Sequence, residues 1–594
     1  VLESMLKYCQ NMIKYIQREN LIDIRRQYMD VGVKSQSKQK KSKIQGFMDK
    51  IEMLGNKLPH PVLMFIYISI FVLLASAVLG SLGVVAHTTL GDFPINNLLG
   101  QEPIEVLKVG ASGATVSERY SNGLSYIIGT AINNFMDMKA IGSILIIMLA
   151  IGLMEHSGYL SIAMKSVVKA TPVKLVTPVV IFLGVMSNLA SDAGYVVLIP
   201  LAALMYYTLG RHPLAGLAAG FAGVSGGFSA NLFVSSTDAL LLPFTQAAAE
   251  TGDALAGTNL AGSLSVTSNW FFMMASTAVI MLLGTLVIDK FVEPRLGKYN
   301  KSEASIDQNH NETEKEIKAF KFTNKVMLVV LGLIVLAALP LDKGNKIFLL
   351  GDLSTNVPLW GTNAEGLPAL VEVDGFLNSI FFQGDIVMMI MFVIFAASGL
   401  VYGFKSGKFA KPADVVPAMV KAMADMAPII VILYFVAQFL NYFNDSHIGI
   451  LIASMGAKLV EMIPQGNMFM TIVLMVAFIF LTAFVNLFMG GASSKWGLLA
   501  PIFVPILMVA GFTPAGVQLI YRIGDSATNV ISPLMSYLGV IVVFGQKYKK
   551  EFGVGNLIST MMPISMAFLF GWTAFAIIWA LLGFPIGPGT TFFI

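Results

Sequence analysis

The sequence predicts an all-α, polytopic membrane protein with nine transmembrane helices and two re-entrant helical hairpins arranged as inverted-topology repeats. Hydrophobic residues make up 56% of the 594 residues and charged residues only 12%, which excludes an ordinary soluble protein. Many apolar segments approach or exceed the roughly 20 residues with which an α-helix crosses a bilayer. A third observation, one polar pattern that occurs twice inside apolar sequence, indicates what these helices do.

The repeated pattern occupies residues 188–236 and 486–533. Each copy interrupts an apolar stretch twice with residues rich in Gly, Ser and Asn. Within hydrocarbon, such interruptions are tolerated only where protein or a water-filled cavity satisfies the freed backbone groups. Paired interruptions in corresponding halves are typical of a transporter's binding site near the bilayer midplane. In order, the copies contain Asn188, Ser191-Asp192, His212-Pro213 and Gly226 to Asn231, and then Asn486, Ser493-Ser494, Thr513-Pro514 and Gly524 to Asn529.

The first half of the chain begins with a polar, lysine-rich extension at residues 1–46. This extension has no apolar run resembling a signal peptide, and its lysines predict a cytoplasmic N-terminus. Residues 47–288 form the first membrane half, and the charged residues 289–324 form a cytoplasmic linker. The expected elements of this half are crossings at 61–85, 140–154 and 270–288, hairpin 1 at about 172–210, and a broken helix at about 213–244 interrupted at 223–231.

Residues 325–594 form the second membrane half. Lys405, Lys408 and Lys411 mark a cytoplasmic end, so that the second hairpin enters from the opposite side to the first. The segments 160–170 and 448–460 are predicted to be mirrored amphipathic helices. The remaining elements are crossings at 326–339, 386–402, 422–440 and 558–582, hairpin 2 at about 467–511 interrupted at 486–496, and a broken helix at about 514–545 interrupted at 524–529.

Hairpin tips and broken helices supply the oxygen ligands that small cations prefer, namely carbonyls, Asn amides, hydroxyls and carboxylates. Half-helix N-termini suit a substrate carboxylate. A helix cap or an interhelical hydrogen bond explains any single Ser, Thr or Asn equally well, but the double occurrence favours a binding site, with Na⁺ as the candidate metal ion at the hairpin tips and helix breaks. The cation-binding candidates are Asn188, Ser191, Asp192, Ser229, Asn231, Asn486, Asp525 and Asn529.

Charges at membrane depth cost roughly 2.5–3.5 kcal/mol each on insertion scales, so they indicate function. Arg522 and Asp525 are three residues apart, and they form either a structural ion pair or a site in which Arg522 binds an anionic substrate and Asp525 a proton or cation. Asp192 is the candidate coupling residue. Lys495 and Trp496 lie at the second hairpin tip, where they contact substrate or anchor the interface. Asp238, near a predicted helix end, is expected to be solvated.

Other function classes receive little support. The net charge of +4 derives largely from short basic segments near membrane ends and gives no indication of nucleic-acid binding. A single cysteine, Cys9, excludes an intrachain disulfide. The sequence has no Walker A motif, which disfavours an ATP-driven pump. Gly223 to Gly227 matches the G-x-S-x-G pattern of a nucleophile, but its expected strand and turn are absent, so no enzyme is predicted.

Five segments resemble the AbgT family of p-aminobenzoyl-glutamate transporters and antimetabolite efflux pumps, and the resemblance extends over roughly residues 47–589. It implies a homodimer in the bacterial inner membrane, with nine helices and two hairpins per subunit. The chain departs from the family pattern at its N-terminal extension and at Ser536-Tyr-Leu. The segments lie at 184–204, 210–232, 293–297, 495–505 and 521–535, and the family's functional residues correspond to Asp192, Ser493, Pro514, Arg522, Asp525 and Pro533, with Trp496 beside them.

The resemblance and the repeat together predict a cation-coupled secondary transporter. Its expected substrates are p-aminobenzoyl-glutamate-like folate precursors, sulfonamide antimetabolites, or both, moved by alternating access. The coupling ion is Na⁺ or H⁺, and no other cofactor is expected. Another small carboxylate on the same fold is the alternative substrate, and an intramembrane enzyme is a remote alternative.

Overall fold

The computed structural model describes residues 59–88, 91–109, 115–136, 140–190, 194–300, 313–338, 358–362, 368–372, 384–461 and 467–594. Every described residue belongs to one compact unit within Glu52–Ile594. The extension at residues 1–46 and the candidates Ser191 and Asp192 therefore lie outside the described residues.

Helices dominate the first half of the described chain, as predicted. Two of its helices, α7 and α8, are bent by 64° at Gly158, whose φ of 88° is in the left-handed region that favours glycine. The helices are α4 (Pro61–Ser81), α5 (Gly123–Thr130), α6 (Asn133–Met136), α7 (Ala140–Ser157), α8 (Tyr159–Ala170), α9 (Val176–Ser187), α10 (Ile199–Thr208), α11 (Pro213–Phe221), α12 (Ser236–Ala256), α13 (Trp270–Val287) and α14 (Glu293–Leu296), with shorter turns η1 (Val173–Leu175), η2 (Asn188–Ala190), η3 (Gly194–Leu198), η4 (Ala222–Gly226), η5 (Ala261–Ser263) and η6 (Ile288–Val292).

The second half repeats this helical character. The predicted amphipathic segments at 160–170 and 448–460 are both helical, as α8 and α18. Residues 314–324, assigned from sequence to the linker, belong to the first turns of α15. The helices are α15 (Glu314–Ala338), α16 (Gly384–Ser406), α17 (Val415–Asp445), α18 (Ile448–Glu461), α19 (Met468–Val485), α20 (Ala492–Val509), α21 (Pro514–Asn529), α22 (Leu538–Gln546) and α23 (Val554–Leu581), with the turn η10 (Pro412–Asp414).

Seven helices in the described part of the chain are long and apolar enough to cross a membrane, or eight if the bent pair α7 and α8 forms one span. A multi-span helical membrane protein is thus confirmed, whereas the count of nine crossings plus two hairpins stays a prediction. The description as all-α is incomplete, because polar segments between the apolar helices form three antiparallel hairpins. These are β1 (Val85–Thr88) with β2 (Gly91–Pro94), β3 (Ile104–Val109) with β4 (Thr115–Tyr120), and β5 (Pro358–Thr362) with β6 (Pro368–Glu372).

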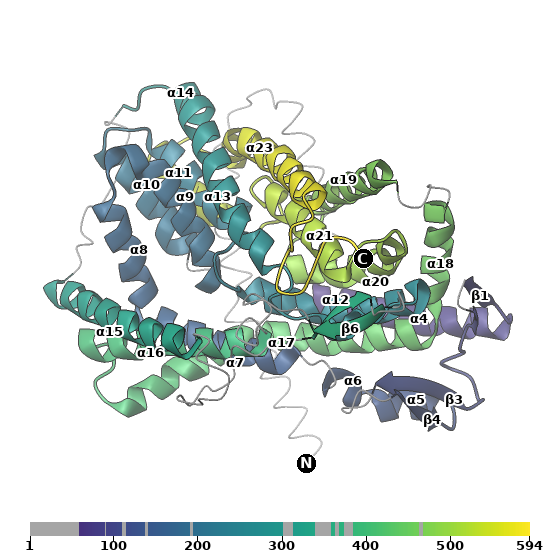
Figure 1. Ribbon diagram of the computed structural model, residues 1–594. Helices are drawn as coiled ribbons and strands as arrows, with labels where there is room; N and C mark the ends of the chain where they lie inside the picture. Colours follow the sequence, from purple (N-terminus) through teal and green to yellow (C-terminus); the bar gives the residue numbers. More distant parts are fainter. Residues whose placement is uncertain are drawn as a thin grey trace, which may run out of the picture. The chain divides into compact units, whose positions relative to one another are not determined.

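Small residues allow several helices to pack closely, as in other membrane proteins. Helix α7 packs against α16 and α17, and α15 packs against α16 (Figure 1). A Cβ atom at Gly152 of α7 would lie 2.2 Å from the Cβ of Ala422 on α17. One at Gly399 of α16 would lie 2.8 Å from the backbone of Leu153. Helices α9, α11 and α13 form another contiguous group, and α12 packs along α20.

Candidate functional site

A glycine crossing occurs once in each half of the protein. Gly223 follows Pro213 by ten residues, and Gly524 follows Pro514 by the same interval. A Cβ atom at Gly223 would lie 2.4 Å from the carbonyl oxygen of Ile181 on α9, and one at Gly524 would lie 2.3 Å from that of Ile479 on α19. In both halves, therefore, the first arm of the hairpin crosses the following helix at a glycine.

This crossing changes the alignment of the two copies. The sequence pattern pairs Gly226 with Gly524, whereas the matching contacts pair Gly223 with Gly524, three residues earlier. Asp525 then corresponds to Val224, and Ser526 corresponds to Ser225. The acidic residue of the second helix consequently has no counterpart in the first, which makes the two copies chemically unequal.

The predicted interruption of the second broken helix at residues 524–529 is wrong. Helix α21 continues to Asn529, and the non-helical segment is 530–537, which contains Pro533. Polar side chains in its last turns are compatible with a helix because neighbours bind them: Thr528 Oγ1 donates to the carbonyl oxygen of Gly524 at 2.9 Å, and Asn486 donates to the carbonyl oxygen of Asp525 at 2.7 Å. Pro533 has no N–H to continue a helical ladder.

The other interruptions also differ in position from the sequence-based ranges. The first helix continues through the π-turn η4, so its non-helical segment is 227–235, which contains the buried residues Ser229 and Asn231. Helix α20 begins at Ala492, which places Ser493 and Trp496 in its first turns and leaves residues 486–491 as the tip of hairpin 2. The first arm of hairpin 1 ends at Asn188.

Lys495 and Asp525 form a fully buried ion pair between α20 and α21, each with 1% of its side chain exposed. The Lys495 ammonium also donates to Asn486 Oδ1. The Asn486 amide nitrogen in turn lies 2.9 Å from both Thr528 Oγ1 and Asn529 Oδ1. Of the predicted cation candidates, Asn486 thus uses its side-chain oxygen to hold Lys495, and Asn529 uses its own to hold the amide of Asn486.

Arg522 forms a second buried ion pair, with Asp238 near the start of α12. Its Nη2 donates to the carbonyl oxygen of Ser229 at 3.2 Å. The expectation that Asp238 is solvated is wrong: the residue is only 7% exposed, and its Oδ2 accepts hydrogen bonds from the N–H of Ser235 at 2.6 Å and from its hydroxyl at 2.8 Å. Arg522 and Asp525 therefore bind separate partners and do not neutralise each other.

A chain of hydrogen bonds connects hairpin 2 to α12 and α21. Trp496 Nε1 and Gln518 Nε2 both donate to Thr245 Oγ1 at 2.8 Å, and Asn269 Nδ2 donates to Gln518 Oε1 at 2.6 Å. The rings of Trp496 and Tyr521 are 4.5 Å apart. This chain holds a large aromatic surface one residue away from Arg522 along α21.

The remaining predicted residues have simpler environments. Pro514 is buried at the first position of α21, where its missing N–H costs no helical hydrogen bond. The preceding residue, Thr513, caps the helix by accepting from the N–H of Gly516 at 3.0 Å. Ser493 is half-buried in the first turn of α20, and Pro533 is half-buried in the non-helical segment 530–537.

Several buried polar atoms around the non-helical segment 227–235 and the facing part of α21 have no hydrogen-bond partner. An unsatisfied buried polar group costs about 1–3 kcal/mol, so these atoms favour a small polar ligand that would supply partners. Asn188 lies at the same place, because its Nδ2 is 3.5 Å from the carbonyl oxygen of Gly227. The unpartnered atoms are Asn188 Oδ1, Ser229 Oγ, both amide atoms of Asn231, Arg522 Nε and Ser526 Oγ.

The unpartnered side-chain oxygens of Asn188, Ser229 and Asn231 are of the type that binds a small hard cation, since Na⁺ binds amide, hydroxyl and carbonyl oxygens. Within the described ranges, no group of three or more His, Cys, Asp or Glu side chains is placed to hold a metal ion. Asp192, the carboxylate that the sequence adds to Asn188 and Asn231, lies outside these ranges, as does Ser191.

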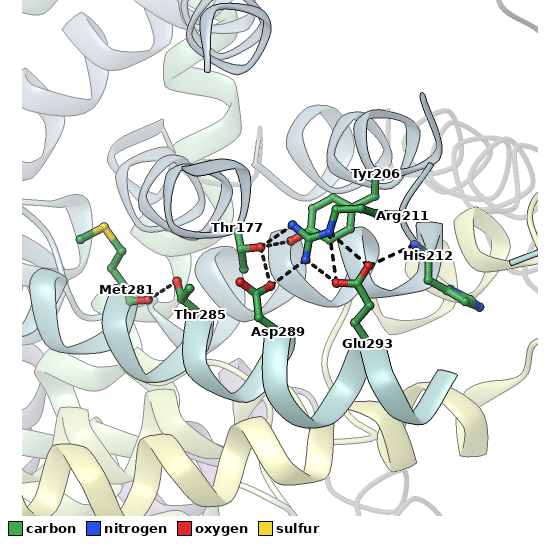
Figure 2. Close-up of polar contacts among 8 residues, drawn as sticks. All are labelled: Thr177, Tyr206, Arg211, His212, Met281, Thr285, Asp289 and Glu293. Carbon is green, nitrogen blue, oxygen red and sulfur yellow. Dashed lines mark hydrogen bonds and ion pairs between the residues drawn. The ribbon is translucent and has the colours of Figure 1, made fainter. Parts of the chain in front are cut away.

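A polar cluster anchors the connection between hairpin 1 and α11 (Figure 2). Arg211 donates to Asp289 at 2.7 Å and to Glu293 through Nε at 3.1 Å, and also reaches Thr177 at 3.0 Å. Its guanidinium carbon lies 4.1 Å from the centre of the Tyr206 ring. Although partial burial opposes its charge, the hydrogen bonds to Glu293 and Asp289 raise the pKa of Arg211. The cluster joins both arms of hairpin 1 to the end of α13.

Sequence reasoning missed Asp238, Thr245, Gln518 and Asn269. The spacing of Ser235 and Asp238 is that of a capping box, which could have placed Asp238 at a helix start. No sequence pattern indicated its partner, because Arg522 is 284 residues away along the chain.

The chain is similar to known proteins over most of its length. The chain is 32% identical over 541 residues to the p-aminobenzoyl-glutamate transport protein of Escherichia coli strain K12, an alignment that covers 91% of the chain and 95% of the relative. It is similar to the crystal structure of the YdaH transporter of Alcanivorax borkumensis, with a TM-score of 0.75 and 35% identity over 89% of this chain and all of the other.

A second solved structure, MtrF of Neisseria gonorrhoeae, which represents a class of antimetabolite efflux pumps, matches with a TM-score of 0.72 and 37% identity over 92% of this chain and all of the other. The model of the AbgT putative transporter family matches residues 46–347 and 368–594. With a family match over most of its length and relatives above 30% identity, the chain belongs to the AbgT putative transporter family.

Proposed function

We propose that this protein is a cation-coupled secondary transporter that moves p-aminobenzoyl-glutamate-like carboxylates by alternating access. The observation that carries the proposal is the Arg522 guanidinium, buried inside α21 with its Nε unpartnered. A buried guanidinium presents planar donors that match a carboxylate. The proposal includes a homodimer in a bacterial inner membrane with cytoplasmic N-termini.

The aromatic pair beside Arg522 supports an aromatic substrate. Trp496 is fully buried and lies against Tyr521, the neighbour of Arg522 in sequence. A substrate with a carboxylate and an aromatic ring would be bound by both parts of this site. The Escherichia coli relative carries the name of such a compound, p-aminobenzoyl-glutamate.

Sulfonamide antimetabolites are the second candidate substrates. They share an aminobenzene ring with p-aminobenzoyl-glutamate, so the Trp496 and Tyr521 surface favours them as well. The similarity to MtrF, from a class of antimetabolite efflux pumps, supports this candidate. The two substrates differ in charge, and therefore in how strongly they depend on Arg522.

Coupling is proposed to involve the oxygens of Asn188, Ser229 and Asn231 and the ion pair of Asp525 with Lys495. The three polar residues have unpartnered atoms that a Na⁺ ion would bind, whereas Asp525 carries a carboxylate that a proton would neutralise. Alternating access would move the two hairpins and the non-helical segments relative to the surrounding helices.

An intramembrane enzyme has less support. Ser225, the serine of the G-x-S-x-G pattern, lies in the π-turn η4, and its hydroxyl contacts Met535 Sδ at 3.4 Å. A nucleophilic serine of this type needs a strand and a tight turn before its helix. This serine has neither, since α11 leads directly into η4.

The test is flux of p-aminobenzoyl-glutamate and of a sulfonamide into proteoliposomes, with Na⁺ and H⁺ gradients imposed separately. Saturable, gradient-dependent flux of either compound would support the proposal and identify the coupling ion. Absence of flux under every gradient, with protein shown to be inserted and monodisperse, would overturn the substrate assignment. Cleavage products of the substrate would instead support an enzyme.

A further inference from the structure

We infer that Asp238 is a built-in competitor of the substrate, a carboxylate that occupies Arg522 until the carboxylate of a transported anion replaces it. The inference rests on the proposed function and adds a specificity-determining residue to it. The residue was not among those that the sequence indicated.

The first support is the state of the Arg522 guanidinium. Its Nη1 binds Asp238 and its Nη2 donates to the Ser229 carbonyl oxygen, while its Nε has no partner. Asp238 therefore holds the place of one carboxylate and leaves one donor for another. An incoming carboxylate that binds Nε brings a second negative charge to the same guanidinium, and like charges at this distance repel strongly in a buried setting.

The second support is that Asp238 remains well held without Arg522. Its Oδ2 accepts two hydrogen bonds from Ser235, at 2.6 and 2.8 Å, and it lies in the first turn of the 21-residue helix α12. The N-terminus of a helix stabilises a carboxylate through its exposed N–H groups and dipole. Exchange of Arg522 from Asp238 to substrate therefore leaves the start of α12 intact.

The exchange has a consequence for coupling. Released Asp238 is a buried carboxylate whose Oδ1 has lost its cationic partner, and an uncompensated buried charge is strongly unfavourable. Uptake of a proton or a Na⁺ ion neutralises it. Binding of an anion at Arg522 and uptake of a cation at Asp238 are thereby linked within one ion pair.

The test uses Asp238→Asn in the full-length protein reconstituted in proteoliposomes. Asparagine keeps an oxygen that accepts from Ser235 but removes the competing charge. Loss of the competing carboxylate should lower the apparent KM of p-aminobenzoyl-glutamate by about tenfold or more, because Arg522 is free in a larger fraction of the protein. The KM of an uncharged diamide of the same compound should stay unchanged, and accumulation against a gradient should fall to the level of downhill flux.

Asp253→Asn is the matched control. Asp253 lies on the same helix and binds the N–H groups of Leu260 and Ala261, at 2.9 and 2.8 Å. Its substitution should leave the KM of both compounds unchanged. A folded Asp238→Asn protein with wild-type KM for the anion would overturn the inference while leaving the transporter proposal intact. Absence of wild-type flux would overturn the transporter proposal, and the inference with it.

A second measurement does not depend on the folding of Asp238→Asn, which leaves Arg522 without its counter-charge. Infrared difference spectra of the wild-type protein, recorded on adding isotope-labelled p-aminobenzoyl-glutamate, separate the carboxylate bands of protein and substrate. A change in a protein carboxylate band that persists in Asp253→Asn supports the exchange. Binding without any change in protein carboxylate bands overturns it. Repeating the measurement with and without Na⁺ distinguishes a proton from a sodium ion.

Discussion

Arg522 and Asp525 lie three residues apart on α21, and each is paired with a charge from a different helix, Asp238 of α12 and Lys495 of α20. Four charges are thus buried at the contact of three helices in the described structure. Arg522 and Asp525 therefore do not neutralise each other, and the exchanges proposed above with a substrate carboxylate and with a cation would act on two separate ion pairs.

Arg522→Ala should weaken anionic substrates more than neutral ones. We expect the KM of p-aminobenzoyl-glutamate to rise roughly 30-fold, equivalent to about 2 kcal/mol, because the variant removes the cationic partner of the substrate carboxylate. A neutral aromatic analogue should change by less than about threefold. The measurement is competitive uptake in proteoliposomes. Equal losses for both compounds would indicate that Arg522 is structural.

Asp525→Asn should abolish gradient-driven accumulation and lower thermal stability. The substitution leaves the Lys495 ammonium buried without a counter-charge, which costs about 3–5 kcal/mol in comparable buried pairs. The double variant Lys495→Met with Asp525→Leu removes both charges and should melt at a higher temperature than the single variant, still without coupled transport. A single variant that melts like the wild type would contradict the buried pair.

Gly524→Ala and Gly223→Ala should each destabilise the protein by about 1–3 kcal/mol, because the added methyl group overlaps a backbone carbonyl of the facing hairpin arm. Gly332→Ala in α15, where no atom lies within 4 Å of the added Cβ, is the control and should cost nothing. Thermal melting of the purified variants is the measurement. If Gly524→Ala lowered the melting temperature no more than Gly332→Ala, α19 and α21 would not be in close contact at Gly524.

The stability of the protein should fall as the pH is lowered from about 6.5 towards 4, in part because of His212. Burial lowers the pKa of His212 from 6.5 to about 4 despite the nearby Glu293 carboxylate, and its Nδ1 accepts from the N–H of Leu214 at 3.2 Å. The unfolded chain therefore binds a proton in this range that the folded protein does not. His212→Asn keeps an acceptor at the helix cap and should have a smaller drop in melting temperature between pH 7 and pH 5. If the melting temperatures of the variant and the wild type fell equally, His212 would not contribute to the loss of stability at low pH.

Asp192→Ala should abolish coupling while leaving the protein folded. The residue follows Asn188, whose Oδ1 is buried without a partner, so a carboxylate there would complete a cation site. Uptake measured with and without the coupling gradient is the test, and size-exclusion chromatography controls for folding. Wild-type gradient dependence in this variant would remove Asp192 from the coupling mechanism.

Sequence patterns identified the apolar helices and the repeated polar pattern, because glycine, proline and amide residues interrupt apolar sequence recognisably. The two re-entrant hairpins stay a prediction. The same patterns misplaced the interruption in α21, since Gly524 to Asn529 is polar in composition yet helical in structure. Asn486 and Lys495 bind the polar groups of this segment. Such contacts between residues far apart in the chain cannot be recognised from the local sequence. Asp238 was misjudged for the same reason, because its partner Arg522 lies 284 residues away along the chain, on α21.

The Arg211 cluster would restrict motion of the surrounding helices during the proposed transport cycle. Its guanidinium is bonded to Thr177 at the start of α9 and to Asp289 and Glu293 beyond α13, and it follows α10 directly. Both ends of hairpin 1 are therefore fastened to the neighbouring helix at a single residue. Spin labels placed on these three segments should therefore report constant separations throughout the proposed transport cycle.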